Sequence, residues 1–173
     1  QAARQACLQL CSGVILCMGE KREDVLETAY TLRHLASESI PINFFIPIKG
    51  TQLSEHPELS PGYCLRVLCL YRFLNPKAEI RIAAGRELHL RSMEVMALYP
   101  ANSLFLDGYL NAKGHERIRT FQMIKDASFS IQSDHSLDDL IAKETPLKSD
   151  LRNNQVTQAM MKDLTDLRPQ LIQ

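Results

Sequence analysis

The chain has 173 residues, of which 45% are hydrophobic, 23% charged and 6% aromatic. This composition supports a folded domain with a full core and excludes a disordered or collagen-like chain. Twenty Lys plus Arg balance twenty Asp plus Glu, so the zero net charge gives no electrostatic support for a nucleic-acid or membrane-surface partner. An odd count of five cysteines, without a secretory signal, indicates a reducing, cytoplasmic compartment. The apolar runs are shorter than the about 20 residues of a membrane-spanning helix.

Short apolar strands alternate with amphipathic helices through most of the chain. The predicted strand and helix pairs are 8–16 with 22–36, 40–46 with a helix from the Ser60-Pro61 cap to the Asn75-Pro76 stop, 79–84 with 92–98, and 103–106 with 115–127. Arg86-Glu87 is expected to pair locally and to begin the third helix. Residues 132–173 predict a polar helical tail, with segments at 136–144 and 153–167.

The predicted strands lack polar alternation, which is typical of a parallel sheet buried on both faces by right-handed crossovers. Two architectures fit four such units. One is a small doubly wound sheet, and the other is the second half of an eight-stranded barrel of about 250 residues.

Functional residues of parallel α/β proteins gather where strands end, and the most unusual such segment runs from Cys11 to Glu20. Its glycines allow a planar or phosphate-like ligand to approach the backbone, with Glu20 meeting a ligand amine. The alternative is an ordinary turn in which Glu20 favours the start of the next helix. Cys11 is either a small apolar core residue or a ligand.

Two polar side chains interrupt apolar strands and require partners. Arg81 needs an ion pair, for which Glu20 and Asp107 are candidates, or else a functional role. Asn43 must hydrogen-bond either the backbone or a ligand with both donors and acceptors, such as a urea or an amide.

The cysteine spacing does not form a complete metal site. Cys7, Cys11 and Cys17 match neither a zinc knuckle nor a ferredoxin sequence, and Cys64 and Cys69 do not share a helix face well. The five scattered histidines make a hydrolytic zinc site unlikely to form from this chain.

Four motifs, in order, resemble the carboxyl-terminal half of the biotin synthase family of radical S-adenosylmethionine (SAM) enzymes, over about residues 3–131. They are Cys-Ser-Gly-Val-Ile-Leu-Cys-Met-Gly-Glu at 11–20, Ser-Ile-Pro-Ile-Asn-Phe-Phe-Ile-Pro-Ile-Lys-Gly-Thr at 39–51, Glu-Ile-Arg-Ile-Ala-Ala-Gly-Arg-Glu at 79–87 and Ala-Asn-Ser-Leu-Phe at 101–105. The second and third are not general barrel motifs. The resemblance implies an α/β fold in which residues 1–131 form the second half of a radical SAM (β/α)8 TIM-type barrel and residues 132–173 form a tail.

The resemblance implies sulfur insertion into dethiobiotin to form biotin. A [4Fe-4S] cluster and SAM would generate a 5'-deoxyadenosyl radical, and a [2Fe-2S] cluster would donate the sulfur. Cys11 and Arg81 match two [2Fe-2S] ligands, and Asn43 matches the amide that binds the ureido ring of dethiobiotin. The strand that supports SAM is matched by Gly13, Ile15 and Glu20. The family also implies a cytoplasmic homodimer and a flavodoxin-like electron donor.

The chain departs from the family pattern at several positions. Val14 and Cys17 replace glycines, and Asn111 begins a segment where a threonine-rich loop would receive the dethiobiotin carboxylate; backbone donors or Lys113 would replace that loop. The Cys-x3-Cys-x2-Cys loop for the [4Fe-4S] cluster and two further [2Fe-2S] cysteines belong to the family's first half. We therefore expect the chain to begin at Gln1 inside a larger protein and to be inactive alone.

Two alternatives stay open. One is a related radical SAM enzyme with another substrate, which the substitutions at Val14, Cys17 and Asn111 would favour. The other is a noncatalytic α/β domain in which Cys11 and Arg81 are core residues.

Overall fold

The computed structural model describes residues 2–48, 53, 59–106, 108–109 and 114–153, with the backbone alone for 146–153. The chain divides into two compact units, Gln1–Phe105 (unit 1) and Leu106–Gln173 (unit 2), and each is described by itself. None of the helices in the described ranges combines the length and apolar character needed to cross a bilayer.

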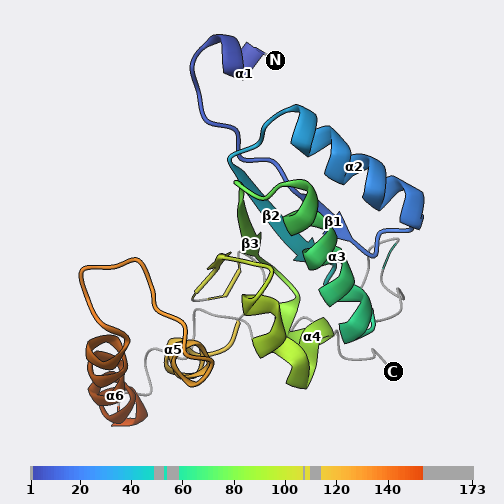
Figure 1. Cartoon of the computed structure of the whole chain (residues 1–173). Coiled ribbons are helices and arrows are strands. Elements are labelled where there is room, and N and C mark those ends of the chain that lie inside the picture. Colours follow the sequence, from blue (N-terminus) through green and yellow to red (C-terminus); the bar gives the residue numbers. More distant parts are fainter. Residues whose placement is uncertain (1, 49–52, 54–58, 107, 110–113, 154–173) are drawn as a thin grey trace, which may run out of the picture. The chain divides into compact units, whose positions relative to one another are not determined.

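Unit 1 contains a parallel sheet and the helices that connect its strands (Figure 1). In chain order its elements are α1 (Ala2–Gln5), β1 (Val14–Leu16), α2 (Arg22–His34), β2 (Ser39–Phe44), α3 (Pro61–Leu74), β3 (Glu79–Ile82), α4 (Arg86–Leu90), the 3-10 helix η1 (Arg91–Leu98) and β4 (Ser103–Leu104). The strands lie side by side in the order β1-β2-β3-β4, and each neighbouring pair is parallel.

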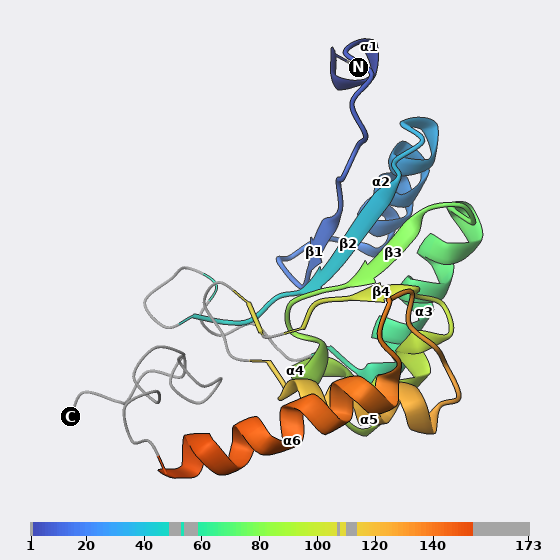
Figure 2. The same ribbon diagram turned by 90° about the vertical axis from the view of Figure 1, so that its left-hand side faces the viewer.

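This strand order distinguishes between the two architectures. Successive right-handed crossovers that always advance in one direction place their helices on one face of the sheet. Figure 1 and Figure 2 both show α2 and α3 on the same side of the strands. A doubly wound sheet would instead reverse its order and carry helices on both faces. The expected fold class, α/β with the parallel β-α units of a TIM-type half-barrel, is confirmed.

The core lies between the sheet and α2 with α3. Every second residue of β2 and β3 is buried there, namely Ile40, Ile42, Phe44, Ile80 and Ile82. The helices contribute Val25, Ala29, Leu32, Leu68 and Tyr71.

The other face of the sheet is only partly buried within unit 1, so the expectation of burial on both faces is wrong for this unit. The reason is visible in the residues: β2 reads Ser-Ile-Pro-Ile-Asn-Phe and β3 reads Glu-Ile-Arg-Ile, and both alternate between intermediate exposure and burial. We call this second side the open face and define it by Cys11, Ile15, Ser39, Pro41, Asn43, Glu79, Arg81 and Ser103.

Helix α3 has the boundaries that its sequence predicts. The Ser60 hydroxyl accepts a hydrogen bond from the Tyr63 N–H at 3.3 Å, and Pro61 occupies the first turn, where no intrahelical donor is needed. Asn75 ends the helix, and its buried amide donates to the carbonyls of Tyr71 and Ala29 at 3.2 and 3.4 Å. The same residue therefore ends α3 and holds it against α2.

The first strand and the third helix differ from their predictions. Residues 8–16 were expected to form a strand, yet β1 spans Val14–Leu16, preceded by an isolated bridge between Cys11 and Ser39. The third helix begins at Arg86, as expected, but Arg91 adopts φ +52° and separates α4 from η1. The helix expected at 92–98 is therefore a 3-10 helix, because a residue with positive φ interrupts the α-helical bonding.

Gly85 sits at a close approach between two strand ends. Its φ is +79°, and a Cβ atom there would lie 2.1 Å from the Phe44 carbonyl oxygen. Only glycine combines this conformation with this contact. Gly85 therefore fixes where β3 turns into α4.

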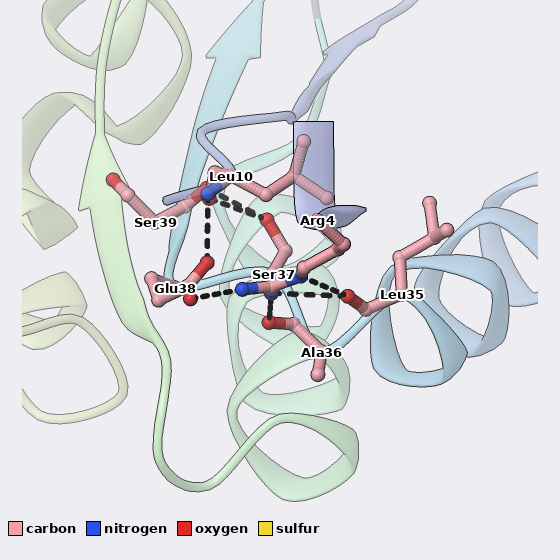
Figure 3. A network of polar contacts seen from close by, with 7 residues as sticks. All are labelled: Arg4, Leu10, Leu35, Ala36, Ser37, Glu38 and Ser39. Atoms are coloured by element: carbon pink, nitrogen blue, oxygen red, sulfur yellow. Dashed lines mark hydrogen bonds and ion pairs between the residues drawn. The ribbon is translucent and has the colours of Figure 1, made fainter. Parts of the chain in front are cut away.

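A polar network ties the beginning of unit 1 to the amino end of the sheet (Figure 3). Arg4 pairs with Glu38 and donates to the Leu35 carbonyl at 3.1 Å and to that of Ala36. The second Glu38 oxygen accepts the Leu10 N–H at 2.8 Å. Arg4 and the Leu10 N–H together hold the pKa of Glu38 at about 2, below its ordinary value of 4.5.

Unit 2 contains α5 (Arg117–Asp126) and α6 (Leu137–Asn153). Ser136 and Asp139 form a reciprocal cap at the start of α6, with Asp139 N–H donating to Ser136 Oγ at 3.1 Å and Ser136 N–H donating to Asp139 Oδ2 at 3.3 Å. An ion pair of 2.5 Å joins Lys125 to Asp138. The helix expected at 115–127 is confirmed as α5, and the segment expected at 136–144 extends to Asn153; the expected helix at 153–167 otherwise lies outside the described residues.

Replacing Gly85 by alanine should lower the free energy of unfolding by at least about 2 kcal/mol, because the new methyl group would collide with the Phe44 carbonyl in a left-handed backbone. Gly62→Ala is the matched control, since its Cβ would find only the flexible end of Arg66, 3.7 Å away. Urea unfolding measures both. Equal midpoints for the two variants would contradict the contact.

The Arg4–Glu38 pair should stabilise the fold in a pH-dependent way. The folded-state pKa of Glu38 is depressed, so its contribution is present above the ordinary value of 4.5 and is lost as the pH falls toward about 2. Glu38→Gln should therefore lower the urea midpoint at pH 7. The difference in midpoint between the variant and the parent should shrink as the pH falls from 4.5 to 2. Arg4→Met should reduce the same pH dependence, because Arg4 is the largest cause of the depressed pKa and the Leu10 N–H remains. A parent–variant difference that is constant across this range would refute the assignment.

Candidate active site

The sheet register arranges the polar residues of the open face in rows. From the amino to the carboxyl ends of the strands, the rows are Cys11-Ser39-Glu79, Pro41-Arg81-Ser103 and Ile15-Asn43. Neighbouring strands lie about 4.8 Å apart, and alternate residues of one strand about 6.6 Å apart. Cys11 and Arg81 thus lie on the same face and in neighbouring rows, with β2 between them.

Arg81 has a defined set of contacts on this face. Its Nε donates to Ser103 Oγ at 3.0 Å, its Nη2 pairs with Glu79, and its guanidinium lies 5.2 Å from the centre of the Phe105 ring. Nη1 makes no hydrogen bond to any residue that the structure describes. Two of the three guanidinium nitrogens are therefore held by protein, and the third is left for a ligand.

The ion-pair partner observed for Arg81 is Glu79, which the sequence did not suggest. Glu20 is wrong as a partner, because its two carboxylate oxygens accept the N–H groups of Cys17 and Met18 at 2.6 and 2.7 Å. Asp107 lies outside the described residues. Glu79 takes this role because residues two apart in a strand point to the same face.

Among the cysteines of unit 1, Cys11 combines exposure with a place on the open face. Cys64 is fully buried, and desolvation raises the pKa of its thiol to about 12. Burial, with the Glu20 carboxylate second, also raises the pKa of Cys17. Both buried thiols therefore resist forming the thiolate that a metal requires.

Asn43 uses half of its hydrogen-bonding capacity on the backbone. Its Nδ2 donates to the Val14 carbonyl at 3.2 Å, and its Oδ1 accepts the Ala84 N–H at 3.2 Å. The amide is thereby held between β1 and the end of β3. One N–H and one oxygen lone pair have no protein partner among the described residues and are available to a ligand.

The three residues matched to SAM binding have different surroundings. Ile15 is 52% exposed on the open face. Gly13 lies against β2, where a Cβ would approach the Pro41 carbonyl oxygen to 1.8 Å, so packing of the chain alone requires glycine there. Glu20 closes its own turn and lines a cavity of 440 Å³ with Tyr63 and Arg66 of α3. The structure thus brings Ile15, but not Glu20, together with Cys11, Asn43 and Arg81.

Val14 and Cys17 stand at two positions where the resemblance implies glycine, and their backbones differ. Val14 is an ordinary strand residue paired with Ile42. Cys17 instead adopts φ +75°, a left-handed conformation that favours glycine. The substitution at Cys17 therefore strains the turn after β1, whereas Val14 fits its strand.

A buried charged cluster that no sequence motif indicates lies just beyond β3. Arg86 is 1% exposed; it contacts Glu87 at 3.3 Å, as expected, but also contacts Glu94 at 2.9 Å and donates to the Phe105 carbonyl at 2.6 Å. Glu94 follows Arg86 by eight residues, and no local pattern indicates that the two meet. The cluster holds the end of β4, and with it the ring beside Arg81.

His89 joins the two ends of the connection between β2 and α3. Its Nδ1 accepts the Leu59 N–H at 3.0 Å, and its Nε2 lies 2.8 Å from the Phe45 carbonyl oxygen. A neutral ring protonated on Nε2 satisfies both groups. Lys49, Thr51, Asn111 and Lys113, which belong to family motifs or their replacements, lie outside the described residues.

The donor set of the open face suits an iron–sulfur cluster. Cys11 offers an exposed thiol, Arg81 offers a nitrogen that has no partner within the described part of the chain, and the surrounding strands form a rigid support. Thiolate and nitrogen donors are ligands that iron–sulfur clusters accept. Two ligands do not complete such a cluster, so further donors would have to join them.

The one-directional parallel sheet, with α2 and α3 on one side, defines an α/β domain of the β/α-barrel type. A family model described as the Biotin and Thiamin Synthesis associated domain matches residues 41–130. The chain belongs to this family.

Curated relatives give the more particular likeness. The chain is 54% identical over 132 residues to a biotin synthase of Magnetococcus marinus, covering 76% of this chain and 41% of the relative. It is 53% identical over 137 residues to a biotin synthase of Acaryochloris marina, covering 79% and 40%. A biotin synthase of Geobacillus kaustophilus is 47% identical over 132 residues, covering 76% and 40%. The resemblance to biotin synthase is confirmed, and the chain spans about two fifths of the length of these relatives.

Arg86→Met should destabilise unit 1 by about 3–5 kcal/mol, because it removes a buried cation that contacts the buried carboxylates of Glu87 and Glu94. Lys125→Met in unit 2, which removes an ion pair between exposed side chains, should leave the thermal midpoint nearly unchanged. Differential scanning calorimetry measures both. An Arg86→Met midpoint close to that of the parent would show that the cluster is not needed for the fold.

Proposed function

We propose that this chain forms the part of a biotin synthase that binds dethiobiotin and the sulfur-donating [2Fe-2S] cluster. The observation that carries the proposal is the arrangement of Arg81, which the protein fixes through Nε and Nη2 while Nη1 stays available, on the same face as the exposed Cys11. If Arg81 served only as the ion-pair partner of Glu79, no exposed thiol would be needed on the same face. The similarity to curated biotin synthases supports the same assignment.

The bound groups would supply radical and sulfur chemistry: a [4Fe-4S] cluster with SAM would generate the hydrogen-abstracting radical, and the [2Fe-2S] cluster would donate sulfur between two carbons of dethiobiotin. The residues of this chain that would hold the [2Fe-2S] cluster are Cys11, through Sγ, and Arg81, through a guanidinium nitrogen. The segments that the relatives carry outside the matched region would supply the other cluster ligands. We propose that this chain is inactive without them.

Asn43 would orient the substrate. A ureido group has both N–H donors and a carbonyl acceptor, and Asn43 keeps one N–H and one oxygen lone pair for such a partner. Because its other two bonds go to β1 and β3, the amide cannot rotate freely and presents these groups in a fixed direction. It lies one row closer than Arg81 to the carboxyl ends of the strands.

The remaining roles follow from the first strand. The exposed Ile15 would provide an apolar surface for SAM, while Gly13 and Glu20 would shape the strand and the turn that place it. We further propose that the enzyme is a cytoplasmic homodimer and receives electrons from a flavodoxin-like donor.

The test is anaerobic reconstitution, with iron and sulfide, of the protein that carries this chain. Arg81→Met should change the visible spectrum of the [2Fe-2S] cluster, because a thioether replaces the nitrogen donor, and should reduce conversion of dethiobiotin to biotin. Arg66→Met is the matched control, since Arg66 is exposed on α3, away from the open face. It should leave both measurements unchanged.

Three results would oppose the proposal or a part of it. Absence of visible charge-transfer absorption in the reconstituted parent would favour a noncatalytic domain. A cluster that forms but supports no biotin production would favour a radical SAM enzyme with another substrate. An unchanged spectrum in Arg81→Met would remove Arg81 from the ligand set.

A further inference from the structure

Glu79 is an acidic side chain on the open face whose contacts all lead to the candidate cluster ligands. It precedes Arg81 by two residues in β3, so both side chains share one face, and its carboxylate pairs with Arg81 Nη2. Ser39 Oγ donates to the same carboxylate at 3.4 Å. The side chain retains 39% of its exposure and is therefore not part of the core.

The sheet register places Glu79 in the row of Cys11 and beside Arg81 on the same strand. Cys11 bridges to Ser39, Ser39 pairs with Glu79, and Glu79 reaches along its own strand to Arg81. A group bound by both Cys11 and Arg81 would therefore have this carboxylate beside it. This placement depends on backbone pairing and does not require any movement of the chain.

Glu79 also limits the orientation of the guanidinium. Ser103 holds Nε, and the Phe105 ring lies 5.2 Å from the group. The Glu79 carboxylate adds a charged contact to Nη2, which the planar guanidinium places beside Nε–H. Glu79 and Ser103 together thus leave Nη1 as the nitrogen that faces a ligand.

An ion pair between partly exposed side chains contributes little to stability. The Arg81 and Glu79 side chains are 29% and 39% exposed, so the pair is not explained by a large stabilising effect. A fixed negative charge has a larger consequence for a redox group, because reduction adds an electron beside it and is disfavoured.

We infer that Glu79 is a positioning residue for the [2Fe-2S] site: it orients Arg81 so that Nη1 faces the cluster, and its charge lowers the cluster's reduction potential. The inference rests on the proposed function and deepens it. It concerns the protein's control over one of the cluster ligands and assigns no bond from Glu79 to iron.

The test uses anaerobic redox titration and visible spectroscopy of the reconstituted protein that carries this chain. Glu79→Gln preserves the size of the side chain but removes its charge, and should shift the midpoint potential of the [2Fe-2S] cluster to a more positive value and alter its absorption bands. Glu79→Asp, which keeps the charge, should restore a potential closer to that of the parent. Glu38→Gln is the matched control, because it makes the same chemical change in another arginine pair outside the open face, and should leave the potential unchanged.

The outcomes separate the two proposals. If the parent assembles no [2Fe-2S] cluster, the proposed function fails, and the role of Glu79 fails with it. If the parent cluster forms and Glu79→Gln titrates at the same potential with the same spectrum, the inference is overturned while the proposed function stands. Loss of the cluster in Glu79→Gln, with retention in Glu79→Asp, would support the orienting role.

Discussion

The two-residue period of β2 and β3 is the constraint on which the rest of unit 1 depends. It sends Ile40, Ile42 and Phe44 toward the helices and leaves the intervening side chains on the opposite side of the sheet. Because the strands are parallel and follow one another in order, the polar residues of each strand meet those of its neighbours in rows. The same alternation thus forms the core and collects Cys11, Asn43 and Arg81 on one surface.

The surroundings of Arg81 show how a sheet can present a charged residue without burying it in the core. Arg81 is contacted directly by residues of its own strand and of β4. The buried Arg86 in turn holds the residue after β4 by donating to the Phe105 carbonyl. The position of the Arg81 guanidinium therefore depends in part on the buried cluster around Arg86. A change at Glu94 could alter the site without contacting any ligand.

Much of this arrangement could be predicted from the sequence, because the decisive signals are local. The Ser60-Pro61 start and the Asn75 end of α3, and the apolar residues of β2 and β3, are specified within a few residues. The contact between Arg86 and Glu94 depends on side-chain geometry that spacing does not encode, and Glu79 was not named as the partner of Arg81. The Glu79 partner was nevertheless detectable in principle, because residues i and i+2 of a strand share a face.

The histidine at position 89 has a consequence for how this domain can vary. Its ring contacts Phe45 and Leu59, so the points at which the chain leaves β2 and enters α3 are joined by a side chain from a third element. One ring therefore holds both places, and a substitution at position 89 would loosen the chain after β2 and before α3 at the same time.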